Sequence, residues 1–144
     1  METRSGMTVL ELLLTLVLIG ILAAIAAPAV RSTIDILSAR AAREAAFGLF
    51  SRARGLALQH GGAEVELDAA ADRMIVRRPS GAIEAEQAFA PQGVDLTLDS
   101  TITAVVLRYD AYGLGRMMSR TVTFSARSAR AGLTLSSFGR ARRW

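Results

Sequence analysis

Residues 5–30 have the sequence S-G-M-T-V-L-E-L-L-L-T-L-V-L-I-G-I-L-A-A-I-A-A-P-A-V. This segment decides how the rest of the chain is interpreted, because its only charged side chain is that of Glu11. An α-helix rises about 1.5 Å per residue, so residues 7–30 are long enough to cross the hydrocarbon layer of a membrane, which is about 30 Å thick. We therefore predict a transmembrane helix over residues 7–30.

Glu11 lies one turn into this apolar helix and needs a partner. An ionised carboxylate near the centre of a bilayer costs about 2.5–3.5 kcal/mol on insertion scales. No cationic side chain lies within the span. The nearest candidate partner is the α-amino group that cleavage after Gly6 would create on Met7. Gly6 suits such a cut, because a residue without a Cβ lets a protease approach the backbone closely.

The order of Gly6, Met7, Thr8 and Glu11, followed by a long apolar run, resembles the class III signal of type IV pilins and type II secretion pseudopilins. The resemblance implies that residues 1–6 are a leader, which prepilin peptidase, a membrane aspartyl peptidase, removes between Gly6 and Met7. It also implies N-methylation of the new amine on Met7. In such proteins the amine then pairs with the glutamate of a neighbouring subunit, here Glu11. Met7 departs mildly from the phenylalanine that is most common at this position.

Two simpler interpretations of the same segment remain open. In an ordinary membrane anchor, the helix dipole would favour Glu11 at the N-terminal turn, and its carboxylate could fold back to its own amine. In a secretory signal peptide, Ala24-Ile25-Ala26 would supply the small residues before a cleavage site. Against the signal peptide, the apolar run exceeds the usual length of about 7–15 residues, carries an acid and is closely followed by Pro28.

The composition limits what the rest of the chain can be. The chain has 144 residues, 17 basic and 13 acidic, and a formal net charge of +4; every basic side chain is arginine. After the helices there is room for one small domain. The sequence contains no cysteine, which excludes disulfides, thiolate metal sites and thiol nucleophiles. The flanking charges orient the span only weakly. The family resemblance places it as a single pass in the inner membrane, with the leader cytoplasmic and the C-terminal domain periplasmic.

A second helical segment is predicted over residues 31–60. Gly20 and Pro28 are the weak points of the preceding span, and a kink or a local opening is expected between them, because proline cannot donate the helical hydrogen bond. In pilin-like proteins Pro28 would matter for assembly. Apolar residues then recur at helical spacing and predict an amphipathic helix that lies on a sheet. The stripe comprises Ile34, Leu37, Ala41, Ala45, Leu49, Ala53 and Leu56, widened by Ala42, Ala46, Phe50 and Ala57.

From residue 61 onward the apolar period changes to two, which predicts β-strands. The predicted strands cover residues 64–68, 73–77, 83–89, 94–98, 105–109, 121–125 and 133–137. Short turns between them favour antiparallel pairing over residues 61–144. The predicted fold class is α+β and pilin-like: a long N-terminal helix, transmembrane in its first half, packed on a small antiparallel β domain.

The soluble part resembles the H-type minor pseudopilins, also called the GspH/FimT family. The similar segments are A-R-G-L-A-L-Q-H-G-G at residues 53–62, L-R-Y-D-A-Y-G at residues 107–113, L-T-L at residues 133–135 and G-R-A-R at residues 139–142. Together they cover about half of the soluble part. The resemblance implies a structural subunit rather than an enzyme, with no cofactor. The one histidine, His60, lies at a helix end, and Asp95 and Asp99 match no calcium loop, so no metal site is predicted.

The C-terminal segment G-R-A-R-R-W is the one candidate ligand-binding feature. Arg140, Arg142 and Arg143 could contact phosphates, and Trp144 could stack on a base. The pattern resembles one in FimT-type minor pilins that bind DNA during uptake. A solvated basic tail is the ordinary alternative.

The sequence thus favours a minor pseudopilin of a type II protein secretion system that assembles near the tip of a periplasmic pseudopilus. Its expected partners are prepilin peptidase, the inner membrane and other pseudopilins, major and minor, contacted through the N-terminal helices. The alternative is a FimT-like minor type IV pilin that binds DNA through its arginine-rich C-terminus.

Overall fold

The computed structural model describes residues 8–99, 102–116 and 119–144. Helix α1 spans Val9–His60, a length of 52 residues, and is followed by eight β-strands and a short 3-10 helix among the described residues. The chain divides into two compact units, residues 1–34 and residues 35–144. Helix α1 therefore contributes its first part to one unit and its second part to the other.

The first unit contains the apolar half of α1. Every side chain from Thr8 to Ile34 is exposed, and an 18-residue window of this helix is apolar enough to cross a membrane. The helix is continuous through Gly20 and Pro28, so the local opening predicted between them is not present. The opening is therefore corrected, because one missing backbone donor did not break the helix, while the kink, the other form of the prediction, stays a prediction.

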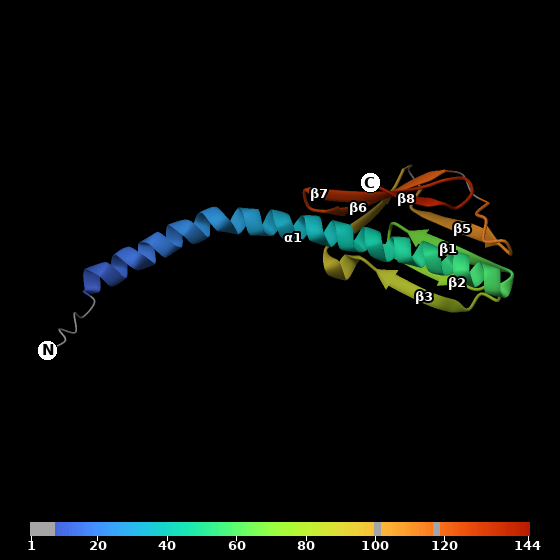
Figure 1. Ribbon diagram of the computed structural model, residues 1–144, viewed down its shortest axis with the longest axis horizontal. Helices are drawn as coiled ribbons and strands as arrows, with labels where there is room; N and C mark the ends of the chain where they lie inside the picture. The colour runs from blue at the N-terminus through green and yellow to red at the C-terminus, as the bar shows by residue number, and fades with distance from the viewer. Residues whose placement is uncertain (1–7, 100–101, 117–118) are drawn as a thin grey trace. The chain divides into compact units, whose positions relative to one another are not determined.

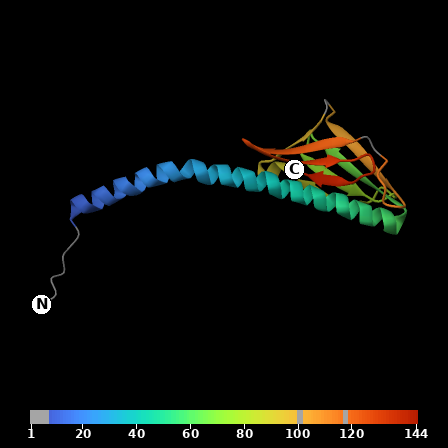
Figure 2. The same cartoon turned by 45° about the horizontal axis from the view of Figure 1, so that its top comes forward.

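The second unit contains two four-stranded antiparallel sheets. The first has the order β3-β2-β1-β5 and the second the order β4-β6-β7-β8. Figures 1 and 2 show residues 35–60 of α1 running along both sheets. The strands are β1 (Gly62–Asp68), β2 (Arg73–Arg77), β3 (Ile83–Ala88), β4 (Asp95–Leu98), β5 (Ala104–Asp110), β6 (Arg120–Ala126), β7 (Ala129–Leu135) and β8 (Ala141–Arg143), with the 3-10 helix η1 (Ala90–Gln92) before β4.

The core lies between the second part of α1 and the inner faces of both sheets. Phe89 and Phe124 meet edge to face, with ring centroids 5.1 Å apart, which is a favourable arrangement for aromatic pairs. Alternation along each strand puts the apolar side chains on this inner face. The buried core residues of α1 are Ala39, Ala42, Ala46, Phe50, Ala53, Leu56 and Ala57.

The buried stripe of α1 differs from the predicted one at its start. Ile34, Leu37 and Ala41 are exposed, and the line of fully buried residues runs instead through Ala42 and Ala46. Neighbouring alanines are equally apolar, so periodicity could not show which of each pair faces the core. One residue turns a helix by about 100°, so this ambiguity displaced the predicted stripe.

Two predicted features of the second sheet also required correction. Strand β7 begins at Ala129 rather than at residue 133, because β6 and β7 form a tight hairpin in which Ala126 pairs with Ala129. Strand β8 was not predicted at all. The C-terminal segment is therefore part of a sheet and not a solvated tail.

Candidate functional site

The N-terminus of α1 is capped by Thr8. The backbone N–H of Glu11 donates to the Thr8 side-chain hydroxyl at 3.2 Å, and the N–H of Leu12 donates to the Thr8 carbonyl at 3.1 Å. The order Thr-x-x-Glu is the sequence of a capping box, in which the first residue satisfies a free helical N–H. Thr8 thereby fixes where the helix begins, one turn before the Glu11 carboxylate.

The Glu11 side chain is exposed, and the structure shows no cation paired with it among the described residues. Gly6 and Met7 lie outside the described residues. Cleavage between them, methylation of the Met7 amine and its pairing with Glu11 stay predictions. Pro28 lies inside α1 with an exposed side chain.

Strand β8 places the side chains of Arg142 and Arg143 on opposite faces of the sheet. In this strand Arg142 lies opposite Thr134 and Arg143 lies opposite Leu133 of β7. Successive side chains of a strand point to opposite faces. Leu133 is fully buried, so Arg143 shares the face that packs towards α1, whereas Arg142 lies on the outer face with Thr134. The three arginines therefore do not form one surface.

Arg143 is occupied by contacts with α1. Its guanidinium donates to the Glu44 carboxylate at 2.8 Å, and its Cζ lies 4.6 Å from the centroid of the Phe47 ring. Arg43 donates both to Glu44 at 2.8 Å and to the carbonyl oxygen of Trp144 at 2.9 Å. Hydrogen bonds from Arg143 and then Arg43 lower the pKa of the Glu44 carboxyl below its ordinary value. These contacts anchor β8 to the helix.

Sequence reasoning missed this role of the helix. Arg43 and Glu44 lie outside the predicted apolar stripe, yet the Arg43 side chain is only 19% exposed and donates to Trp144. Phe47 also lies outside the predicted stripe, and it packs against the core. No signal within the helix itself identifies the partner, since Glu44 and Arg143 are 99 residues apart in sequence.

Arg140 and Arg142 are different, because both side chains are exposed and no ion pair joins either of them to a described residue. They line an open pocket of about 470 Å³ together with Ser119, Thr134, Ser136 and Ala141. Arg130 lies earlier in β7, an even number of residues before Thr134, so its side chain is on the same outer face. Guanidinium groups beside hydroxyls form a surface that can bind phosphate oxygens.

The other polar candidates do not form a site. Asp99 is held by Arg120, 3.5 Å away, and accepts a hydrogen bond from the backbone N–H of Thr121 at 3.1 Å. Within the described part of the chain, no three His, Cys, Asp or Glu residues gather closely enough to hold a metal ion.

Comparison with known proteins shows the fold. No family model and no curated protein matches the chain. The type IV minor pilin FimU of Pseudomonas aeruginosa is similar in two crystal forms. In one form the TM-score is 0.57 at 18% sequence identity over 74% of this chain and 87% of FimU, and in the other it is 0.55 at 18% over 73% and 91%. The minor pseudopilin EpsH of the type 2 secretion system of Vibrio cholerae is similar with a TM-score of 0.59, at 11% identity over 74% of this chain and 96% of EpsH.

These similarities confirm the predicted fold class. The chain has a pilin-like α+β fold, with a long N-terminal helix that is apolar in its first part and antiparallel sheets packed against its second part. FimU and EpsH share this fold with the chain.

Proposed function

We propose that this chain is a minor pseudopilin of a type II protein secretion system, and that it assembles near the tip of a periplasmic pseudopilus. The precursor would sit in the inner membrane as a single pass, with residues 1–6 cytoplasmic and the β domain periplasmic. Prepilin peptidase would cut after Gly6. The similarity to EpsH and FimU supports a pilin-type subunit, and the choice of the secretion system rests on the H-type features of the sequence.

The observation that carries this proposal is the fully exposed apolar half of α1 with one acid in its first turn. No apolar side chain from Val9 to Val30 is buried. Such a helix needs lipid or other apolar helices around it. Assembly would move it from lipid into a bundle of like helices, where the Glu11 carboxylate would meet the Met7 amine of an adjacent subunit and avoid the cost of an unpaired charge.

The test replaces Glu11 by alanine in the full-length chain. We expect Glu11→Ala to insert and be processed but to be lost from the filament fraction and from complexes with other pilin-type subunits. Asp35→Ala, which removes an acid from the same helix beyond the apolar span, is the matched control and should assemble normally. Mass spectrometry of the mature protein should find Met7 as the first residue. Normal assembly of Glu11→Ala, or retention of the first six residues, would contradict the proposal.

A second candidate function is DNA binding by a FimT-like minor pilin, and one observation favours it. Arg140 and Arg142 border the same hydroxyl-lined pocket without acidic partners among the described residues. Of the three arginines predicted to contact DNA, Arg143 is already engaged by Glu44 and Phe47. The proposed contacts are therefore Arg140 and Arg142.

Titration of labelled DNA with the full chain in detergent tests this candidate. Arg140→Gln and Arg142→Gln together should weaken binding and reduce the slope of log affinity against log salt by about 0.9 for each lost phosphate contact. Arg127→Gln, at an exposed turn, is the control. Absence of binding at low salt would remove this candidate.

A further inference from the structure

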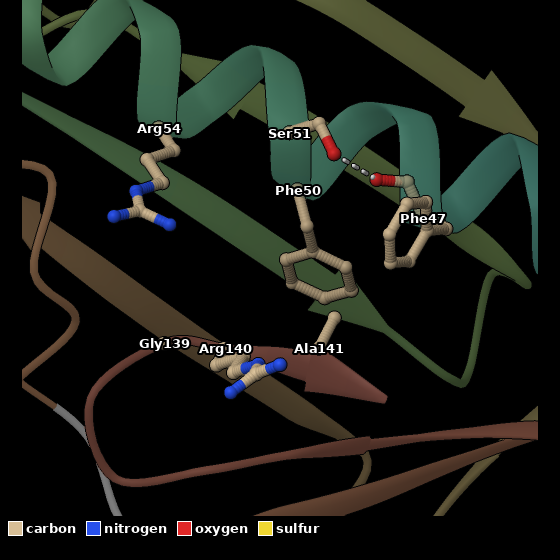
Figure 3. Close-up of a pocket in the computed structure, with 7 residues that line it drawn as sticks. All are labelled: Phe47, Phe50, Ser51, Arg54, Gly139, Arg140 and Ala141. Carbon is tan, nitrogen blue, oxygen red and sulfur yellow. Dashed lines mark hydrogen bonds between the residues drawn. The ribbon is translucent and has the colours of Figure 1, made fainter. Parts of the chain in front are cut away.

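A second pocket lies between α1 and the turn that joins β7 to β8. Phe47, Ser51 and Arg54 line it from the helix, and Gly139 and Arg140 line it from the turn (Figure 3). Its volume is about 270 Å³ and it opens to solvent. All of these residues belong to the second compact unit. The pocket is separate from the outer face of β8, although Arg140 borders both.

The walls of this pocket are held in place by the surrounding structure. Gly139 has a φ of +77° and accepts a hydrogen bond from the buried Tyr109 hydroxyl at 3.1 Å. A Cβ at Gly139 would lie 2.6 Å from the Tyr109 ring and 2.9 Å from the backbone nitrogen of Gly115, so the turn has no freedom to carry a side chain there. On the helix side, the Ser51 hydroxyl donates to the carbonyl of Phe47 at 3.0 Å. The pocket is thus formed before any ligand enters.

The charge of the pocket is positive and uncompensated. Arg54 and Arg140 have no acidic partner among the described residues, whereas nine other arginines of the same unit form ion pairs. Figure 3 shows Arg54 extending from the helix on the side of the turn that carries Arg140. Two guanidinium groups that line one pocket favour an anionic group in it, and their planar geometry matches a carboxylate.

The surface beside Arg54 is apolar. A Cβ at Gly113 would lie 3.0 Å from Arg54 and 3.4 Å from Leu58, so the turn after β5 contacts this part of the helix. Leu58 is 59% exposed, and Phe138, in the same turn as Gly139, is 72% exposed. Phenylalanine and arginine are enriched at protein interfaces, and the exposed Leu58 adds apolar area beside them.

We propose that this pocket receives the carboxylate of an aspartate or glutamate side chain on a neighbouring pilin-type subunit. Arg54 and Arg140 bind the carboxylate, and Leu58 and Phe138 cover apolar atoms of the same partner segment. This inference rests on the proposed assembly function. It adds a contact between soluble domains to the contact between helices.

The test uses the full-length chain in cells that make the complete set of pilin-type subunits. Leu58 is replaced by the photo-reactive amino acid p-benzoylphenylalanine, which the exposed position accommodates, and the cross-linked peptide is identified by mass spectrometry. We expect an adduct with a pilin-type subunit at a segment that carries an aspartate or glutamate within a few residues. The same replacement at Ile83, which is 54% exposed on β3, is the control for general proximity.

Charge reversal then tests the ionic contact. In the Leu58 cross-linking background, Arg54→Glu should lower the yield of the adduct by about tenfold, the size expected for an interface anchor. Arg54→Lys should lower it less, and Arg127→Glu, at an exposed arginine with no ion pair to any described residue, should leave it unchanged. Replacing the identified acid by arginine should restore the adduct with Arg54→Glu.

Several results would overturn the inference: an adduct with nucleic acid, an adduct at a segment without an acid, no adduct at Leu58, or a yield that Arg54→Glu leaves unchanged. Co-purification of the chain with pilin-type subunits is measured in the same samples. A chain that co-purifies but gives no adduct at Leu58 overturns the pocket contact alone. A chain that co-purifies with no such subunit overturns both this inference and the proposed function.

Discussion

The indole ring of Trp144 lies directly over Gly132 of strand β7. The two residues exchange both backbone hydrogen bonds, at 3.1 and 3.2 Å, so Trp144 continues the pairing of β8 beyond Arg143. A Cβ on Gly132 would lie 2.2 Å from the indole ring. The absence of a side chain at residue 132 therefore permits the ring to cover the outer face of the sheet. Trp144 is the only tryptophan of the chain, so its fluorescence reports this contact.

Gly132→Ala should displace the indole ring into water and shift the emission of Trp144 to longer wavelength. The loss of stability should be small, because Trp144 is 54% exposed and its ring can swing away. Gly48→Ala, on α1 with no atom near its Cβ position, should leave the emission unchanged and stabilise the helix by about 0.5–1 kcal/mol. Unchanged emission in Gly132→Ala would contradict the contact.

Gly139→Ala should destabilise the domain more strongly, because its Cβ meets a buried ring and a backbone atom that cannot move away. Overpacking of this kind costs about 1–3 kcal/mol, in addition to the cost of the left-handed backbone. Gly81→Ala is the matched control, since Gly81 also has a positive φ, +84°, but nothing within 4 Å of its Cβ position. The control isolates the backbone cost, about 1–2 kcal/mol. Thermal unfolding followed by Trp144 fluorescence measures both, and equal losses would refute the steric argument.

Glu44→Gln should weaken the attachment of β8 to α1, and it should make the stability of the domain less sensitive to acid pH. The pKa of Glu44 is lowered in the folded chain, from an ordinary value of 4.5, by its hydrogen bonds with Arg143 and Arg43. A carboxyl group with a lowered folded-state pKa adds stability above its unfolded-state pKa, and this contribution disappears as pH falls through the folded-state value. The wild type and Glu44→Gln should therefore differ in stability at neutral pH and converge below pH 4.5. The effect should be small and salt-sensitive, because the pair is exposed.

Denaturant unfolding at neutral and at acid pH, followed by Trp144 fluorescence, measures this difference. Glu86→Gln is a suitable control, because Glu86 is also an exposed acid paired with an arginine, but it lies on β3, in the other sheet from β8. A difference between wild type and Glu44→Gln that persists unchanged below pH 4.5 would show that the carboxylate is not its source.

Tyr109 should titrate at unusually high pH. Burial raises the pKa of its phenol to about 12, and the nearby Arg54 partly opposes this shift. Because the folded-state pKa is raised, the neutral phenol's contribution to stability is present below the unfolded-state pKa of about 10 and is lost as pH rises towards 12. Absorbance of the phenolate in a Tyr112→Phe background, which leaves Tyr109 as the only tyrosine, follows this titration.

Tyr109→Phe should cost about 0.5–1.5 kcal/mol at neutral pH, since it removes the hydrogen bond to the Gly139 carbonyl and changes little else. Between pH of about 10 and 12, the stability of the wild type should fall, whereas that of Tyr109→Phe should not show this fall. A Tyr109 titration near the ordinary value of 10 would mean that the ring is open to water.

Much of the fold could be predicted because its signals are local. The apolar run with Glu11, the helical spacing of three or four residues and the period-two pattern of the strands each lie within a few residues of sequence. They gave the α+β class, and the resemblance of the N-terminal segment to a class III signal implied its pilin-like form. Helix-to-core register was less certain, because Ala41 and Ala42 are chemically the same. Of the candidate ligand-binding residues, Arg140, Arg142 and Arg143 were recognised by type, but their separation onto two faces was not.

The sequence by itself determined that this chain has one long helix with a single acid in its apolar half, followed by antiparallel strands, because hydrophobic periodicity and charge cost act over short distances along the chain. Only the tertiary structure decided what the C-terminal segment does. A-R-R-W has no apolar alternation to mark it as a strand, and its pairing comes from β7. Arg143 pairs with the Glu44 carboxylate, and Arg140 lines a pocket with Arg54. In both cases the residues are distant in sequence and meet only when the sheets pack on α1.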